Sequence, residues 1–90
     1  LVEERVGPDE FLFSGRVEVG TLREKHGLLV PESEEYDTLA GYLMHLTGDI
    51  PERGGSIETE VFRFTVAQVA HGRIDLVRLQ VKDAEKGYSG

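Results

Sequence analysis

The sequence predicts an α+β domain in which two short helices pack on one face of a mostly antiparallel sheet. Three observations predict it: a capped helical pattern over residues 38–48, a shorter helical pattern that closes at His26-Gly27, and two strand-like runs on either side of His71-Gly72. In chain order, the expected elements are a strand, two helices and a closing run of two or three antiparallel strands.

The domain is expected to span residues 11–82. Residues 1–10 are acidic at first and then punctuated by Gly7-Pro8-Asp9, which is typical of a linker. Phe11-Leu12-Phe13 is aromatic and bounded by turn residues, so a buried strand is expected at the start of the fold. Residues 83–90 carry no structural pattern and are interpreted as a C-terminal tail.

A short helix is predicted after this strand. Val19 and Leu22 are apolar positions with charged residues between and after them, and His26-Gly27 supplies a basic residue followed by a helix-ending glycine. Gly20 and Thr21 weaken the middle of this helix, because both have low helix propensity.

The second helix has clearer boundaries. Asp37 or Thr38 can accept the free backbone N–H groups of the first turn, Gly48 can take the left-handed conformation that ends the helix, and Pro51 prevents its resumption. Between these caps, one face is apolar and carries Leu39, Tyr42, Leu43 and Leu46. Gly41 breaks the pattern at a cost of about 1 kcal/mol relative to alanine. Its presence predicts close approach by the strand at residues 11–15, by the hairpin, or by a ligand; close packing is the preferred interpretation.

The last third of the chain predicts a hairpin whose register can be counted outward from a two-residue turn at His71-Gly72. In that register Phe62, Phe64 and Val66 face Val81, Leu79 and Val77 and form the core face. The other face becomes apolar near the turn, where Ala67 is expected opposite Leu76 and Val69 opposite Ile74. We expect this end to be covered either from within the domain, by Leu12, Leu28 or Leu29, or by a neighbouring domain or second copy.

Composition excludes several classes of function. The chain of 90 residues has a formal charge of −7 and scattered basic residues, which argues against nucleic acid and anionic lipid as partners. No apolar run approaches the ~20 residues that cross a bilayer, so direct membrane insertion is not expected. The absence of cysteine excludes thiolate catalysis and cysteine-ligated zinc, and it fits a cytoplasmic location.

Candidate catalytic and metal-binding residues are few. His26, His45 and His71 have no metal-ligand spacing and are interpreted as structural. The carboxylates of residues 32–37 suit a hard cation such as magnesium, but a charged loop is the favoured interpretation. Gly54-Gly55-Ser56 lacks the strand-to-helix context of a phosphate-binding loop. The sequence therefore predicts no catalytic residue and no metal site.

The order of these motifs resembles the transporter-associated domain found at the C-terminus of CorC and haemolysin C-like proteins. The central match is Asp37-Thr38, then Gly41, then Gly48-Asp49-Ile50-Pro51 and Gly54. The segments 11–17, 62–66 and 74–78 resemble that family's first strand and closing hairpin. The family usually has an acidic residue after the glycine matched by Gly54, whereas this chain has Gly55.

The resemblance implies a non-catalytic, cytoplasmic accessory domain of a CBS-domain protein connected with ion transport, including magnesium and cobalt efflux. It implies contacts with the CBS domains and the membrane domain of a parent protein, and a homodimer is a further expectation. The interaction surface is expected at Ala67, Val69, Ile74 and Leu76, with no cofactor.

A second interpretation is a small-molecule module. The family's fold is similar to a subdomain of flavin-binding oxidases, so FAD or an adenine nucleotide is the alternative ligand. It would bind against the helix face around Thr38, Gly41 and Arg53. A nucleotide site requires convergent polar donors in a concave surface, whereas a docking module requires an exposed apolar patch.

Overall fold

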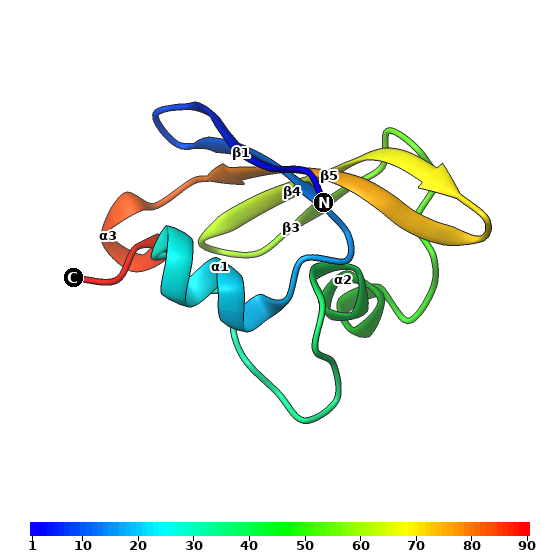
Figure 1. The fold of residues 1–90 in the computed structure, drawn as a ribbon, viewed down its shortest axis with the longest axis horizontal. Helices are drawn as coiled ribbons and strands as arrows, with labels where there is room; N and C mark the ends of the chain where they lie inside the picture. Colours follow the sequence, from blue (N-terminus) through cyan, green and yellow to red (C-terminus); the bar gives the residue numbers. More distant parts are fainter.

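The computed structural model describes all residues, 1–90, and consists of a five-stranded antiparallel sheet with α1 and α2 against one face (Figure 1). Along the chain the elements are β1 (Glu3–Gly7), β2 (Glu10–Ser14), α1 (Val19–His26), α2 (Leu39–Thr47), β3 (Ser56–Glu58), β4 (Phe62–Ala70), β5 (Arg73–Val81) and α3 (Ala84–Gly87). Their order across the sheet is β1-β2-β5-β4-β3. The predicted α+β class, with two helices on one face, is confirmed.

Both ends of the chain are more ordered than the sequence indicated. The segment expected to be a linker contributes β1, which pairs with β2 along Glu3↔Phe13, Glu4↔Leu12 and Arg5↔Phe11. The expected tail forms the short helix α3, capped by the Asp83 carboxylate, and Tyr88 then bridges to Leu28. Neither segment has a clear hydrophobic period, because β1 has only five residues and α3 only four.

The two principal helices begin and end as predicted. Thr38 caps α2 by accepting the backbone N–H of Gly41 at 3.1 Å, and Gly27 and Gly48 end α1 and α2 at φ 67° and 74°. Leu39, Tyr42 and Leu43 of α2 are buried as expected. Leu46 was expected in the core and is 43% exposed, because it lies in the last turn of the helix.

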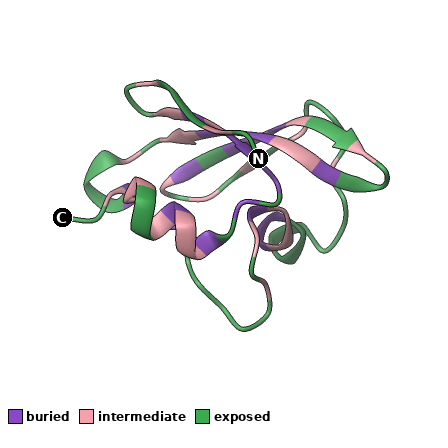
Figure 2. Ribbon diagram, viewed as in Figure 1, coloured by how far each residue is buried: buried purple, intermediate pink, exposed green.

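One hydrophobic core lies between the sheet and the helices, and both layers contain buried residues (Figure 2). The sheet contributes the fully buried Phe13, Phe64, Val66, Val77 and Leu79, and the helices contribute Leu22, Leu39 and Leu43. The structure has no helix of the length and apolarity needed to cross a membrane.

The closing hairpin follows the predicted register except near its turn. His71 and Gly72 both have positive φ, 52° and 72°, as a two-residue type I′ turn requires. Pairing matches the prediction from Phe62↔Val81 to Val66↔Val77 and again at Val69↔Ile74 and Ala70↔Arg73. Between these stretches the register shifts twice, and Gln68 lies opposite Leu76. The predicted pairing of Ala67 with Leu76 was wrong, because Ala67 and Asp75 each occupy a bulge without a partner.

These compensating bulges separate Ile74 from Leu76. An extra residue moves the side chains beyond it to the other face, so Ile74 points toward the helices while Leu76 lies on the outer face. Ile74 is only 1% exposed. The Gly15 backbone N–H donates to the Asp75 carbonyl at 3.0 Å, and a Cβ at Gly15 would lie 2.2 Å from the Ile74 carbonyl oxygen. This part of β5 is therefore covered from within the domain, and the segment at Gly15 packs directly on it.

Candidate functional site

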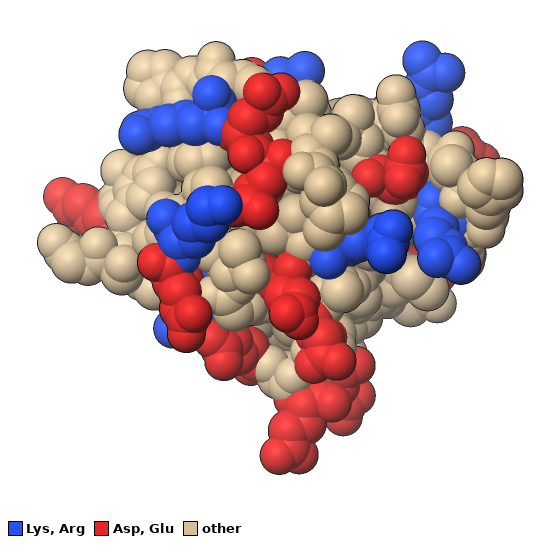
Figure 3. All heavy atoms as spheres, viewed as in Figure 1, with Lys and Arg blue, Asp and Glu red and all other residues tan.

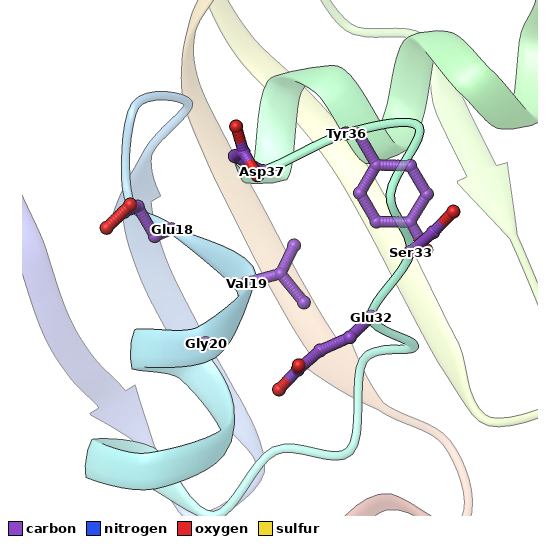
Figure 4. A pocket seen from close by; sticks show the side chains of 7 residues that line it. All are labelled: Glu18, Val19, Gly20, Glu32, Ser33, Tyr36 and Asp37. Carbon is purple, nitrogen blue, oxygen red and sulfur yellow. The ribbon is translucent and has the colours of Figure 1, made fainter.

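A hollow of about 240 Å³ lies between the first turn of α1 and the loop that leads to α2 (Figure 4). Its lining is Glu18, Val19, Gly20, Glu32, Ser33, Tyr36 and Asp37. The hollow exists because the loop of residues 31–37 crosses beside α1 before the chain enters α2. Sequence analysis identified the carboxylates of this loop but did not predict that Glu18 and Val19 of the α1 region face them.

The three carboxylates of the hollow do not converge. Glu32 forms an ion pair with Arg23, with 3.2 Å between Oε1 and Nε. The carboxylate of Glu18 points away from Glu32 (Figure 4). No group of three or more His, Cys, Asp or Glu side chains in the protein is placed to hold a metal ion. Exposed acidic side chains gather over the loop between α1 and α2 (Figure 3). The loop and hollow are thus acidic without a preformed metal geometry.

Tyr36, which lines the hollow, belongs to an aromatic cluster. The rings of Tyr36 and Tyr42 have centroids 5.2 Å apart, and His45 lies 5.4 Å from Tyr36. The Tyr36 hydroxyl donates to the Pro31 carbonyl oxygen, so its polar end is satisfied within the loop. Burial raises the pKa of Tyr42, and the neighbouring Tyr36 raises it further. The two tyrosines therefore stay neutral at physiological pH and provide packing rather than charge.

Thr38 and Gly41, two of the three predicted ligand-binding residues, have local structural roles. The Thr38 hydroxyl oxygen is occupied as the α2 cap. A Cβ at Gly41 would lie 3.1 Å from Tyr36 Cβ and 3.3 Å from Thr38 Oγ1. Close packing at Gly41 is thus present, but the loop before α2 makes it, and neither β2 nor the hairpin does. Arg53 is exposed beyond the end of α2, and no hydrogen bond joins it to Thr38.

The four predicted interaction residues lie in different environments. Ile74 is buried in the core, and Val69, 37% exposed, lies opposite it near the turn. Leu76 is half-buried on the outer face of the sheet, and Ala67 is half-buried in its bulge. The structure therefore leaves only Leu76 clearly on the face that no helix covers (Figure 1).

Leu12, one of the three residues expected to cover the apolar end of the hairpin, is the apolar neighbour of Leu76 on that face. The sequence did not predict its position beside Leu76. Phe11 and Phe13 are buried in the core, so Leu12 between them points to the outer face, where it lies opposite Arg78. Leu76 and Leu12 are diagonal neighbours across the β2–β5 pair. Around them are ion pairs, including Arg78–Glu10 at 2.6 Å and Arg63–Glu58 at 3.1 Å. The alternation of β2 was the available signal, but three residues are too few to establish it.

Comparison with known proteins identifies the family of the chain. The family model of the CorC_HlyC transporter-associated domain matches residues 4–83, nearly the whole chain. The chain belongs to the CorC_HlyC family. Its match begins inside β1, in agreement with a strand there and in contrast to the linker that was expected.

Solved CorC_HlyC-like structures share the fold. A haemolysin domain from Enterococcus faecalis V583 is 26% identical, with a TM-score of 0.79 over 92% of this chain and 100% of its own. A CorC_HlyC domain from a Xylella fastidiosa Temecula1 haemolysin, in complex with Mg²⁺ and Mn²⁺, is 26% identical, with a TM-score of 0.75 over 92% and 100%. The transporter-associated domain of a CBS-domain protein from Porphyromonas gingivalis is 26% identical, with a TM-score of 0.74 over 89% and 97%.

No curated protein matches the chain in a sequence search. The family assignment therefore depends on the family model and on the solved structures, which agree with each other.

Proposed function

We propose that this CorC_HlyC domain is a non-catalytic, cytoplasmic accessory domain that regulates ion transport, including that of magnesium and cobalt, through contacts with the rest of its parent protein. The observation that carries the proposal is the family match over residues 4–83. The Porphyromonas gingivalis relative, which is part of a CBS-domain protein, supports CBS domains as the first contact partner. A membrane domain of the same parent is the expected target of regulation.

The outer face of the sheet is the surface best suited to such a contact. It has no helix over it, and Leu76 and Leu12 form an apolar centre surrounded by the ion pairs of Glu10, Arg78 and Arg63. Apolar residues within a polar border are typical of a non-obligate interface. Of the four residues first assigned to the interface, Leu76 is the one that this proposal retains at its centre.

The proposal is tested by titrating this domain against the CBS-domain portion of its parent in a calorimeter. Leu76→Glu places a charge at the centre of the proposed contact and should weaken binding by at least tenfold. Ser56→Glu is the matched control, because Ser56 is exposed on the outer face at the edge strand β3, away from Leu76. Both variants should melt within a few degrees of the wild type.

Equal binding by the wild type and by folded Leu76→Glu would remove the outer face from the proposal. If wild-type domain and CBS portion show no binding at all at high micromolar concentration, the contact mechanism itself is wrong.

No cofactor is part of this proposal. FAD, ATP and Mg²⁺ titrated separately into the purified domain should give no binding tighter than about 100 μM. Tight binding of FAD or ATP that is lost in Arg53→Ala and kept in Arg73→Ala, which removes another exposed arginine, would favour the small-molecule module instead. Tight Mg²⁺ binding would show that this chain, like the Xylella fastidiosa domain, binds Mg²⁺.

A further inference from the structure

β1 is an edge strand of the sheet and none of its residues is fully buried. Its only strand partner is β2, and its other backbone edge is free. Val2 and Val6 are 42% and 45% exposed. An edge strand with little buried apolar area can separate from a sheet without unfolding the rest. The interactions that hold β1 to the helix layer therefore determine how firmly it is docked.

A cluster of three ionisable side chains connects β1 to the end of α1. The Oε2 atom of Glu3 lies 2.9 Å from Lys25 Nζ and 2.8 Å from His26 Nε2. The Glu3 and His26 side chains are only 18% and 15% exposed, whereas that of Lys25 is largely in water. The His26 ring packs edge-on against Phe13 and Phe11, with centroids 5.0 and 6.0 Å apart. The sequence had indicated only a helix-end role for His26.

We propose that Glu3, Lys25 and His26 form an ionic latch that docks β1 on α1, so that β1 opens as a separate unit when the latch is broken. Opening would free the edge of β2 that β1 covers, and a free edge can pair with another strand.

The charges around the latch favour ionised Glu3. Lys25 and His26 are the ionisable groups that α1 directs at Glu3, and β2 contributes only the uncharged rings of Phe11 and Phe13. On β1 itself, the next inward-facing residue is Arg5, whose guanidinium lies 5.6 Å from the centroid of the Phe11 ring. No other carboxylate pairs with Lys25 or His26 on the helix-facing side of β1.

The latch has a defined pH dependence. The hydrogen bond from Lys25, and then that from His26, hold the pKa of Glu3 below its ordinary value in the docked state. An undocked strand regains the ordinary value, so the latch acts fully above that value and is lost as pH falls through the lowered pKa. Protonation of Glu3 therefore favours opening.

Two adjacent amides, one sensitive to β1 and one not, can measure the opening of β1. The Ser14 N–H donates to the carbonyl of Val2, the residue just before β1, at 2.7 Å, so its protection from hydrogen exchange depends on that segment staying docked. The Gly15 N–H donates to Asp75 of β5 at 3.0 Å and does not depend on β1. NMR hydrogen exchange measures the rate of each amide, which is divided by the intrinsic rate of that residue. The ratio of the Ser14 value to the Gly15 value then separates local opening of β1 from global unfolding.

The test compares wild type with Glu3→Gln and Glu4→Gln. Glu4 is the matched control, because it is the next residue of β1, lies exposed on the opposite face and makes no ion pair. At pH 7, Glu3→Gln should raise the Ser14-to-Gly15 ratio by about 1.5- to fivefold, the range expected for a partly exposed ion pair, and Glu4→Gln should leave it unchanged. On acidification, the ratio should rise in the wild type and in Glu4→Gln and stay flat in Glu3→Gln.

An unchanged ratio in Glu3→Gln would overturn the latch. Equal acceleration of both amides would overturn the separate opening of β1, because it would show that β1 is lost only with the whole fold. Lys25→Gln provides a second measurement that leaves the His26 packing intact, and it should raise the ratio in the same direction.

Discussion

At the scale of single residues, the closest backbone contact is made by Gly15. A Cβ at this position would meet the Ile74 carbonyl oxygen at 2.2 Å and Ala40 Cβ at 3.1 Å. The same residue accepts the Ala40 N–H and donates to Asp75, so it joins β2, β5 and the start of α2. Sequence analysis assigned the equivalent role to Gly41, because a glycine within a helix is conspicuous, whereas one after a strand is not.

Two glycine substitutions test this assignment. Gly15→Ala should destabilise the domain by about 1–3 kcal/mol, because the added carbon meets backbone that cannot rotate away. Gly20→Ala should stabilise it by about 0.5–1 kcal/mol, because a Cβ at that helix position meets nothing within 4 Å and alanine has the higher helix propensity. Urea denaturation of both variants measures the difference; a Gly15→Ala protein as stable as the wild type would contradict the contact.

At the scale of elements, the β4–β5 hairpin determines which residues reach the core. Its turn and most of its pairs follow from the sequence, but the bulges at Ala67 and Asp75 do not. Each strand has one extra residue, so the pairs next to the turn, such as Val69↔Ile74, are the same as in a hairpin without bulges. The turn sequence therefore does not reveal the bulges. What changes is the face on which Ile74 lies.

Alanine substitutions of Ile74 and Leu76 should therefore differ strongly. Ile74→Ala should lower the free energy of unfolding by about 2–5 kcal/mol, because it removes a fully buried side chain. Leu76→Ala should lower it by about 1 kcal/mol or less, since that side chain is half in water. An unbulged hairpin would place both on one face, and similar losses in a chemical denaturation experiment would support that register instead.

The sequence predicted the elements whose signals are local. The Thr38 and Gly48 caps, the Gly27 helix end and the His71-Gly72 turn each depend on the conformational preferences of a few adjacent residues. β1 was missed because its five residues are mostly polar and the Gly7-Pro8-Asp9 turn after it was interpreted as part of a linker. α3 was missed because it is a single turn whose surroundings contact residues distant in sequence. The candidate site was predicted least well. The outer-face position of Leu76 was right and Leu12 was expected as a possible cover, but the diagonal placement of Leu12 beside Leu76 and the burial of Ile74 depend on tertiary packing.

At the scale of the whole molecule, the folded state keeps its tyrosines neutral. Burial raises the pKa values of Tyr36, Tyr42 and Tyr88, and for Tyr88 a hydrogen bond to Asp9 adds to the effect. Because these pKa values are higher in the folded than in the unfolded chain, the associated stability is present below about pH 10 and is lost as pH rises through the raised values.

A spectrophotometric titration checks this expectation directly, since the chain has three tyrosines and no tryptophan. Tyrosinate absorbance should develop at higher pH in the native protein than in the same protein in concentrated urea. Coincident titration curves would show that none of the three hydroxyls is shielded by the fold.

We propose that this CorC_HlyC domain regulates transport by contact through the outer face of its sheet. The most direct measurement is the rate of Mg²⁺ and Co²⁺ transport by the parent protein in vesicles, compared among the intact protein, a form lacking this domain, and the Leu76→Glu and Ser56→Glu variants. We predict that Leu76→Glu changes the rate as deletion of the domain does, while Ser56→Glu transports like the wild type. An unchanged transport rate after deletion of the domain would contradict the claim.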